Sequence, residues 1–143
     1  MKKEDKVKIR EIKFRAWHIS TKRWISIFQL DNQGNLQIET GDSDIWKNIA
    51  PVDYILMQFI GLKDKSGKEI YEMDKIIVTD EHGNEDRGFL KYNEKEMAFV
   101  IDWGENRYRR IMDDGERIEI IGNIYENPEL LTSSETKKNN LKG

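Results

Sequence analysis

The chain contains no cysteine and only two histidines among its 143 residues. The absence of cysteine excludes disulfides, thiolate nucleophiles and every cysteine-ligated zinc or iron–sulfur site. The G-x-S-x-G sequence of serine hydrolases and both glycine-rich phosphate-binding patterns are also missing. The sequence therefore predicts neither a nucleophilic catalytic centre nor a nucleotide site, and we expect no cofactor.

Long hydrophobic runs are missing as well. The longest wholly apolar stretch has only a few residues, whereas about 20 are needed to cross a bilayer. We therefore expect neither a signal peptide nor a membrane span, and we place the protein in the cytoplasm. The length fits one domain, and the aromatic content of 10% indicates a folded body although the mean hydropathy is −0.79.

Positive charge is scarce in the middle of the chain. Residues 1–15 have seven basic and three acidic side chains, and residues 132–143 have three basic and one acidic, so residues 16–131 have a net charge of −9 within the total of −3. An acidic body repels phosphate, so nucleic-acid binding would need a local basic patch. We divide the chain into a basic flexible arm (1–9), one domain (10–131) and a disordered tail (132–143).

The pattern of apolar residues predicts a mainly β protein. Apolar and charged residues alternate from Glu11 to Trp17, which is the period of a strand with one solvent-facing side. Further strands are expected at residues 23–30, 36–39, 54–60, 75–79, 88–92, 98–103 and 117–124. Residues 54–60 are apolar nearly throughout, so this strand is expected to be the most buried. Turn formers separate the strands, and their spacing favours a small antiparallel barrel or sandwich.

Two segments depart from this pattern. Residues 40–53 contain either a short helical turn ahead of Pro51 or an irregular loop. Residues 127–131 begin with Asn127 as an N-cap and Pro128 at the first helical position, so they predict a short C-terminal helix. The expected class is therefore mainly β, of the α+β type.

Two basic segments are candidates for nucleic-acid contact. The first contains Arg10, Lys13 and Arg15. The second contains Arg107, Arg109 and Arg110 beside Trp103 and Tyr108. Arginine next to aromatic rings can stack on bases and neutralise phosphate. The opposite interpretation is that these cations cover aromatic surface and pair with neighbouring acids, and the acidic body favours it.

Residues 80–86 combine His82 with several carboxylates, which are the side chains that could in principle hold a hard cation. The calcium-loop spacing and the HExxH motif are both absent, so this segment is interpreted as a solvent-exposed hairpin tip and no metal site is predicted. The 27 acidic residues leave open a third alternative, a hydrolase that uses carboxylates and a metal.

Four tryptophans are many for one small domain. Aromatic residues are enriched at protein interfaces, so Trp17, Trp24 and Trp46 are candidates for a contact with a partner or a second subunit. The alternative is that they fill the interior of a small barrel.

Three segments together resemble the YopX family of bacteriophage and prophage proteins. They are REIKFRAW at 10–17, LMQFIGLKDKSGKEIYEMDKI at 56–76 and IEIIGNIYENPELL at 118–131. The resemblance implies a phage-encoded protein of Gram-positive bacteria, a β-rich fold with an SH3-like barrel element, and no established biochemical activity. The chain differs from the family pattern at Met73, where the family has glycine, and at His18, where it tends to have an acid.

The middle segment also has a physical interpretation of its own. Asp64 to Gly67 forms a turn, and Ile70 and Tyr71 anchor it. The carboxylate of Asp74 is expected to accept hydrogen bonds from turn amides, which is a structural role and not a catalytic one.

The leading hypothesis is a non-enzymatic phage accessory protein that acts through protein contacts, as a homo-oligomer or with a phage or host protein. The first alternative is a nucleic-acid-binding module that uses the two basic segments.

Overall fold

The computed structural model describes residues 10–42, 45–111 and 117–129 of the chain. The fold is mainly β, and the strands are β1 (Phe14–His18), β2 (Arg23–Ile25), β3 (Phe28–Leu30), β4 (Leu36–Glu39), β5 (Trp46–Asn48), β6 (Tyr54–Lys63), β7 (Glu69–Tyr71), β8 (Asp74–Thr79), β9 (Glu85–Asn93), β10 (Ala98–Gly104), β11 (Arg107–Arg110) and β12 (Arg117–Asn123). A 3₁₀ turn, η2, spans Pro51–Asp53. Within the described ranges no helix is long and apolar enough to cross a membrane. The predicted helix at 127–131 extends beyond the described residues and stays a prediction.

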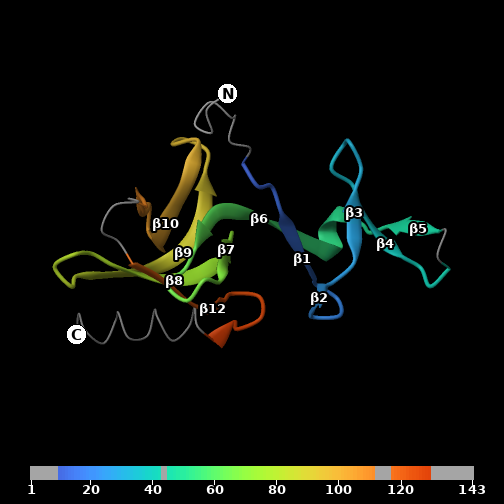
Figure 1. Cartoon of the computed structure of the whole chain (residues 1–143). Coiled ribbons are helices and arrows are strands. Elements are labelled where there is room, and N and C mark those ends of the chain that lie inside the picture. The colour runs from blue at the N-terminus through green and yellow to red at the C-terminus, as the bar shows by residue number, and fades with distance from the viewer. Residues whose placement is uncertain (1–9, 43–44, 112–116, 130–143) are drawn as a thin grey trace, which may run out of the picture.

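The strands form three antiparallel sheets (Figure 1). Their strand orders are β2-β1-β6-β7, β11-β10-β9-β8-β12 and β3-β4-β5. The five-stranded sheet curls into a half-barrel, and its edge strands β11 and β12 do not pair with each other in the described part of the chain, so the barrel is open there. Strand β6 connects β1 with β7. Its residues Tyr54 to Gln58 pair with β1, and Phe59 and Lys63 pair with β7. Figure 1 shows the three-stranded sheet projecting at the end opposite β8 to β10.

The main core lies against one face of the five-stranded sheet. Its buried members are Ile70, Ile76, Val78, Leu90, Ile101 and Ile118. The prediction that residues 54–60 form the most buried strand is wrong, because only Met57 and Phe59 of β6 are buried, whereas four of the six residues of β8 are. Strand β6 links the sheets and leaves part of its length half-exposed, while β8 lies between two strands of the half-barrel.

Two other segments differ from expectation. Residues 23–30 do not form one strand, because the chain breaks at Ser26 and Ile27, so that β2 pairs with β1 and β3 pairs with β4. Residues 40–53 contain strand β5 followed by the 3₁₀ turn η2, which begins at Pro51 instead of preceding it. The apolar run gave no sign of the break, since every residue on both sides of it suits a strand.

Three hairpin turns share one structure that the pattern Asp-x-x-Gly-x encodes. They begin at Asp31, Asp64 and Asp80. In each, the aspartate N–H donates to the carbonyl four residues on, at 3.1, 2.7 and 2.9 Å, and the glycine has φ near +85°. One carboxylate oxygen accepts the backbone N–H groups of the second and fourth following residues, at 2.8 to 2.9 Å. The predicted hairpin tip at 80–86 is therefore observed, and no cluster of metal-ligating side chains occurs among the residues that the structure describes.

The turn at Asp64, which connects β6 with β7, is also hydrogen-bonded to β12. Asp64 is only 8% exposed, and its second carboxylate oxygen accepts the N–H of Ile120 on β12 at 3.2 Å. Burial acts to raise the pKa of Asp64, but the hydrogen bonds from Lys68, Ile120 and Ser66 together hold the pKa below its usual value.

Asp64→Ala is expected to lower the free energy of unfolding by about 2 kcal/mol at pH 7, because it removes a buried carboxylate and leaves the partly buried N–H groups of Ser66, Lys68 and Ile120 without it. Asp31→Ala and Asp80→Ala remove the same turn bonds at exposed sites and should cost about half as much. Because the folded-state pKa of Asp64 is lowered, its contribution is complete above the unfolded-state value of about 3.9 and is lost as the pH falls through the folded-state pKa. Urea denaturation at pH 7 and near pH 3 measures the loss of stability and its pH dependence. If the free energies of unfolding of wild type and Asp64→Ala differ as much near pH 3 as at pH 7, the predicted pH dependence is wrong.

Met73 occupies the left-handed region, with φ of +71°, at the position where the family resemblance expects glycine. Its N–H donates to the carbonyl of Leu90 at 2.7 Å, so the turn is held in place despite the cost of this conformation for a side chain. Met73→Gly is expected to stabilise the fold by about 0.5 kcal/mol, since relief of backbone strain exceeds the added freedom of the unfolded chain. Thermal unfolding compared with Met97→Gly, at a second residue with positive φ that is exposed, tests this; a lower melting temperature for Met73→Gly alone would show that its side-chain packing dominates.

Candidate interaction surfaces

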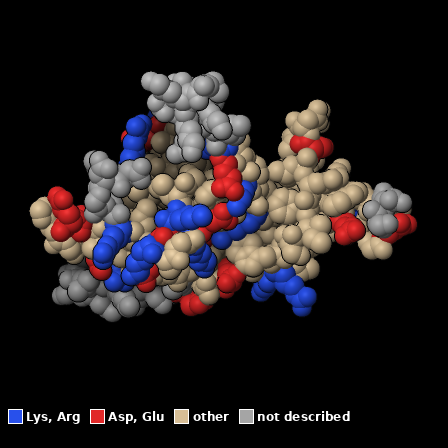
Figure 2. Space-filling model, viewed as in Figure 1, with Lys and Arg blue, Asp and Glu red and all other residues tan. Residues whose placement is uncertain are grey.

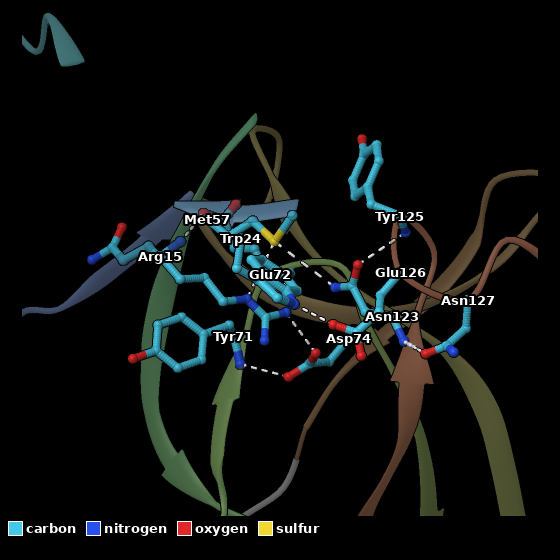
Figure 3. A network of polar contacts seen from close by, with 11 residues as sticks. Arg15, Trp24, Met57, Tyr71, Glu72, Asp74, Asn123, Tyr125, Glu126 and Asn127 are labelled. Carbon is cyan, nitrogen blue, oxygen red and sulfur yellow. Dashed lines mark hydrogen bonds and ion pairs between the residues drawn. The ribbon is translucent and has the colours of Figure 1, made fainter. Parts of the chain in front are cut away.

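Arg15 of β1 is held at the centre of a polar network (Figure 3). One guanidinium nitrogen lies 2.6 Å from a carboxylate oxygen of Asp74, whose side chain is 3% exposed. The guanidinium is also placed between two rings, 4.5 Å from the ring centroid of Trp24 and 4.7 Å from that of Tyr71. The second Asp74 oxygen accepts the N–H of Tyr71 at 2.9 Å, which confirms that this carboxylate bonds a turn amide. Arg15 is therefore held by an ion pair and by two aromatic rings, and its side chain is only 23% exposed.

The same network reaches the end of β12. The side-chain nitrogen of Trp24 donates to the carboxylate of Glu126, which links β2 to the turn after β12. Asn123 is 4% exposed, and its side-chain oxygen accepts the N–H of Tyr125 at 2.9 Å. Segments from both ends of the described chain therefore converge on Arg15, as Figure 3 shows.

The other basic residues of the N-terminal segment are less available than the sequence suggested. Lys13 lies 2.9 Å from a carboxylate oxygen of Glu11 and 2.5 Å from one of Glu69, and these two acids raise its pKa. Arg10 is exposed. Arg10, Lys13 and Arg15 do not form an open cationic surface, because two of the three are neutralised by carboxylates.

The second basic segment forms the edge strand β11 of the half-barrel, which sequence analysis did not predict as a strand. Arg109 lies 2.9 Å from Asp86, and Arg110 lies 3.5 Å from Glu96 and donates to the Glu96 carbonyl at 3.1 Å. Arg107 is exposed and forms no ion pair with any residue that the structure describes. In Figure 2 the basic side chains on the visible face lie among acidic ones. This is the arrangement expected if the cations pair with neighbouring acids and do not bind nucleic acid.

The candidate tryptophans lie in different settings. Trp17 is only 7% exposed and packs edge-on against Trp24, with 5.0 Å between ring centroids. Trp24 is half-buried over Arg15. Trp46 is half-buried on β5, in the projecting sheet and away from the other two. Trp24 and Trp46 both lie on edge strands, β2 and β5, whereas Trp17 lies on the inner strand β1.

His18, Ser20 and Asp53 lie together, although sequence analysis did not connect them. The Nε2 atom of His18 is 2.8 Å from Asp53 Oδ2, and the Ser20 hydroxyl donates to the same oxygen at 2.9 Å. The Ser20 hydroxyl also lies 3.2 Å from His18 Nε2, so serine and aspartate meet the same ring nitrogen, whereas a catalytic triad needs the acid on Nδ1 and the serine on Nε2. These bonds from Ser20 and His18 lower the pKa of Asp53 and fasten the end of β1 to η2.

A shallow open groove of about 530 Å³ runs between β2 and β4. Its lining contains the apolar Ile25, Ile27 and Ile38 together with the polar His18, Arg23 and Glu39. Nearby apolar side chains are also exposed, with Ile45 at 53% and Val52 at 86%. In Figure 2 the charged side chains on the visible face gather mainly over the half-barrel, and fewer lie on the projecting sheet.

A family model and a solved structure both relate this chain to YopX proteins. A family model described as YopX protein matches residues 13–132. The chain is similar to the solved structure of protein yopX from Bacillus subtilis, at 20% identity and a TM-score of 0.57, with 86% of this chain and 99% of that chain covered. It is also similar to protein EF1440 from Enterococcus faecalis, at 26% identity and a TM-score of 0.51, with 85% and 98% covered. None of the curated proteins matches.

Proposed function

The chain belongs to the YopX family, and from that premise we propose that it is a non-enzymatic protein-interaction module that assembles with copies of itself. The observation that carries the proposal is the projecting sheet of β3, β4 and β5. Its strands have only three or four residues each, and its two edge strands, β3 and β5, pair on their outer sides with no other strand in the described part of the chain. Exposed apolar residues, Ile27 and Ile45, directly precede these two strands. Sheets of this size are marginal in water without further packing, so a partner surface would stabilise it.

The distribution of charge supports a protein partner over nucleic acid. Four of the six candidate cations, Lys13, Arg15, Arg109 and Arg110, are in contact with carboxylates, whereas Arg10 and Arg107 are exposed. Releasing Arg15 would leave the buried Asp74 unpaired, which is costly. A role in catalysis has no support from the cluster of His18, Ser20 and Asp53, because its geometry suits structure and not proton transfer.

The remaining parts of the proposal follow the family resemblance. We propose that the protein is encoded by a phage or prophage and acts in the cytoplasm of the bacterial host. We also propose that the half-barrel of β8 to β12 is the SH3-like element, which would be a scaffold for the projecting sheet.

Size-exclusion chromatography with light scattering, on full-length protein purified at low salt, tests the assembly. A defined multimer with a 260/280 nm absorbance ratio of pure protein is expected. A monomer at about 10 µM would reject self-assembly. A monomer that also carries excess absorbance at 260 nm, lost at high salt, would favour the nucleic-acid alternative.

The metal-dependent alternative has a separate test. Thermal unfolding is measured with and without Mg²⁺, Mn²⁺, Ca²⁺ and Zn²⁺ at millimolar concentration. No shift is expected, whereas a rise with one ion that saturates with concentration would show a specific site.

A further inference from the structure

Strand β5 ends the projecting sheet and has a hydrogen-bonding edge that no other described strand covers. The carbonyl of Ile45 accepts from Thr40 at 3.3 Å, and the N–H of Ile49 donates to Leu36 at 3.0 Å, so these odd-numbered residues turn their backbone groups toward β4. The alternation of an antiparallel pair then turns the N–H and C=O groups of Trp46 and Asn48 away from β4. In Figure 1 this strand lies at the far end of the projecting sheet.

A row of side-chain amides crosses the exposed face of this sheet and ends at the same edge. The Gln29 amide donates to Gln37 at 2.7 Å, and the Gln37 amide donates to Asn48 at 2.9 Å. The row takes one residue from each strand, in the register Gln29↔Gln37↔Asn48. Asn48 therefore carries its NH₂ group and a remaining carbonyl lone pair at the end of the row, where they can continue it.

Charge favours a second copy of the chain as the neighbour of this edge. Strands β3, β4 and β5 contain only two charged residues, Glu39 and Lys47. The chain as a whole has a net charge of −3, so two copies repel one another least through an almost uncharged part. Ile45, which is 53% exposed and directly precedes β5, would lose water contact on association.

We propose that two copies of the chain pair through β5 in antiparallel orientation, with the two-fold axis at Asn48. This register places Asn48 opposite Asn48 of the second copy and extends the amide row across six strands. A register centred on Lys47 would place two like charges directly opposite each other, and one centred on Trp46 would leave Asn48 without an amide opposite it. The proposal deepens the proposed self-assembly, on which it rests, by naming its contact.

The absence of cysteine makes a direct test possible. In Asn48→Cys the two new thiols would come from residues whose Cα atoms are about 5.5 Å apart, within the range of a disulfide. Mild oxidation is expected to give a disulfide-linked dimer roughly ten times faster than in Lys91→Cys, an exposed control on β9. Faster linkage in Lys47→Cys than in Asn48→Cys would overturn the register.

A second, non-covalent test uses charge. Asn48→Asp places two carboxylates opposite each other and should weaken self-association roughly tenfold at pH 7 by light scattering. Gln29→Glu puts the same charge at the other end of the amide row and should leave association unchanged. Circular dichroism checks that each variant is folded.

The outcomes separate this proposal from the proposed function. If the wild-type protein is a multimer but Asn48→Cys is linked no faster than the control and Asn48→Asp still assembles, the β5 contact is wrong and self-assembly stands. If the wild-type protein is a monomer, both are wrong.

Discussion

Replacing Gly88 with alanine is expected to lower the free energy of unfolding by about 3 kcal/mol, because there is no room for a side chain between β9 and β10. A Cβ atom at this position would lie 2.6 Å from the carbonyl oxygen of Asp102 and 3.0 Å from Cγ1 of Ile101. The first of these is backbone, so the two strands would have to separate, and a close-packed core resists that movement. The midpoint of thermal unfolding should fall by about 10 °C.

Gly83→Ala is the matched control for this substitution. Gly83 has φ of +85°, and a Cβ there meets no atom within 4 Å, so the change tests backbone strain without a clash. It should cost about 1 kcal/mol. Urea denaturation of both variants decides the question: equal losses would mean that the sheet accommodates the added methyl group at Gly88 at no special cost.

The sequence allowed most of the strands to be predicted because their apolar patterning is local. The strands predicted at residues 75–79, 88–92, 98–103 and 117–124 correspond to β8, β9, β10 and β12, of which β12 ends one residue earlier, at Asn123. The pairing between sheets was not predictable in the same way. Residues 23–30 divide into β2 and β3 because β2 pairs with β1 and β3 pairs with β4. These pairings depend on distant parts of the chain, so the local sequence does not predict them.

The candidate site shows the same limit. Arg15, Trp17, Trp24 and Asp74 each stand out in the sequence, but the sequence does not indicate that Arg15 pairs with Asp74 or that the two tryptophan rings pack together. A basic residue that pairs with a carboxylate 59 positions away has the same local sequence as one that is free. The cluster of His18, Ser20 and Asp53 was missed for this reason too, since Asp53 is brought to the end of β1 only by the pairing of β1 with β6.

One signal for these contacts was present in the sequence and could have been used. The pattern Asp-x-x-Gly-x occurs at each of the three turns that begin at Asp31, Asp64 and Asp80, and its repetition indicates a common turn. This pattern predicts that all three carboxylates accept hydrogen bonds from backbone N–H groups. The three aspartates are then poor candidates for catalytic or metal-binding residues.

Asp74→Ala is expected to lower the free energy of unfolding by about 3 to 4 kcal/mol, because it leaves the Arg15 charge and the Tyr71 N–H unpaired in the interior. The side chain of Arg15 is 23% exposed, which limits how far water can replace the lost carboxylate. Arg15→Met alone should be similarly harmful, since it leaves the buried Asp74 carboxylate without its cation.

The double variant, Arg15→Met with Asp74→Ala, identifies the ion pair as the cause. It should be more stable than the sum of the two single losses predicts, by at least about 1 kcal/mol, because neither charge is then left alone. Equal denaturant dependence in all variants would show that the comparison concerns the folded state. Strict additivity of the two losses would instead mean that Arg15 and Asp74 act independently, Arg15 through its contacts with the rings of Trp24 and Tyr71 and Asp74 through the turn amide.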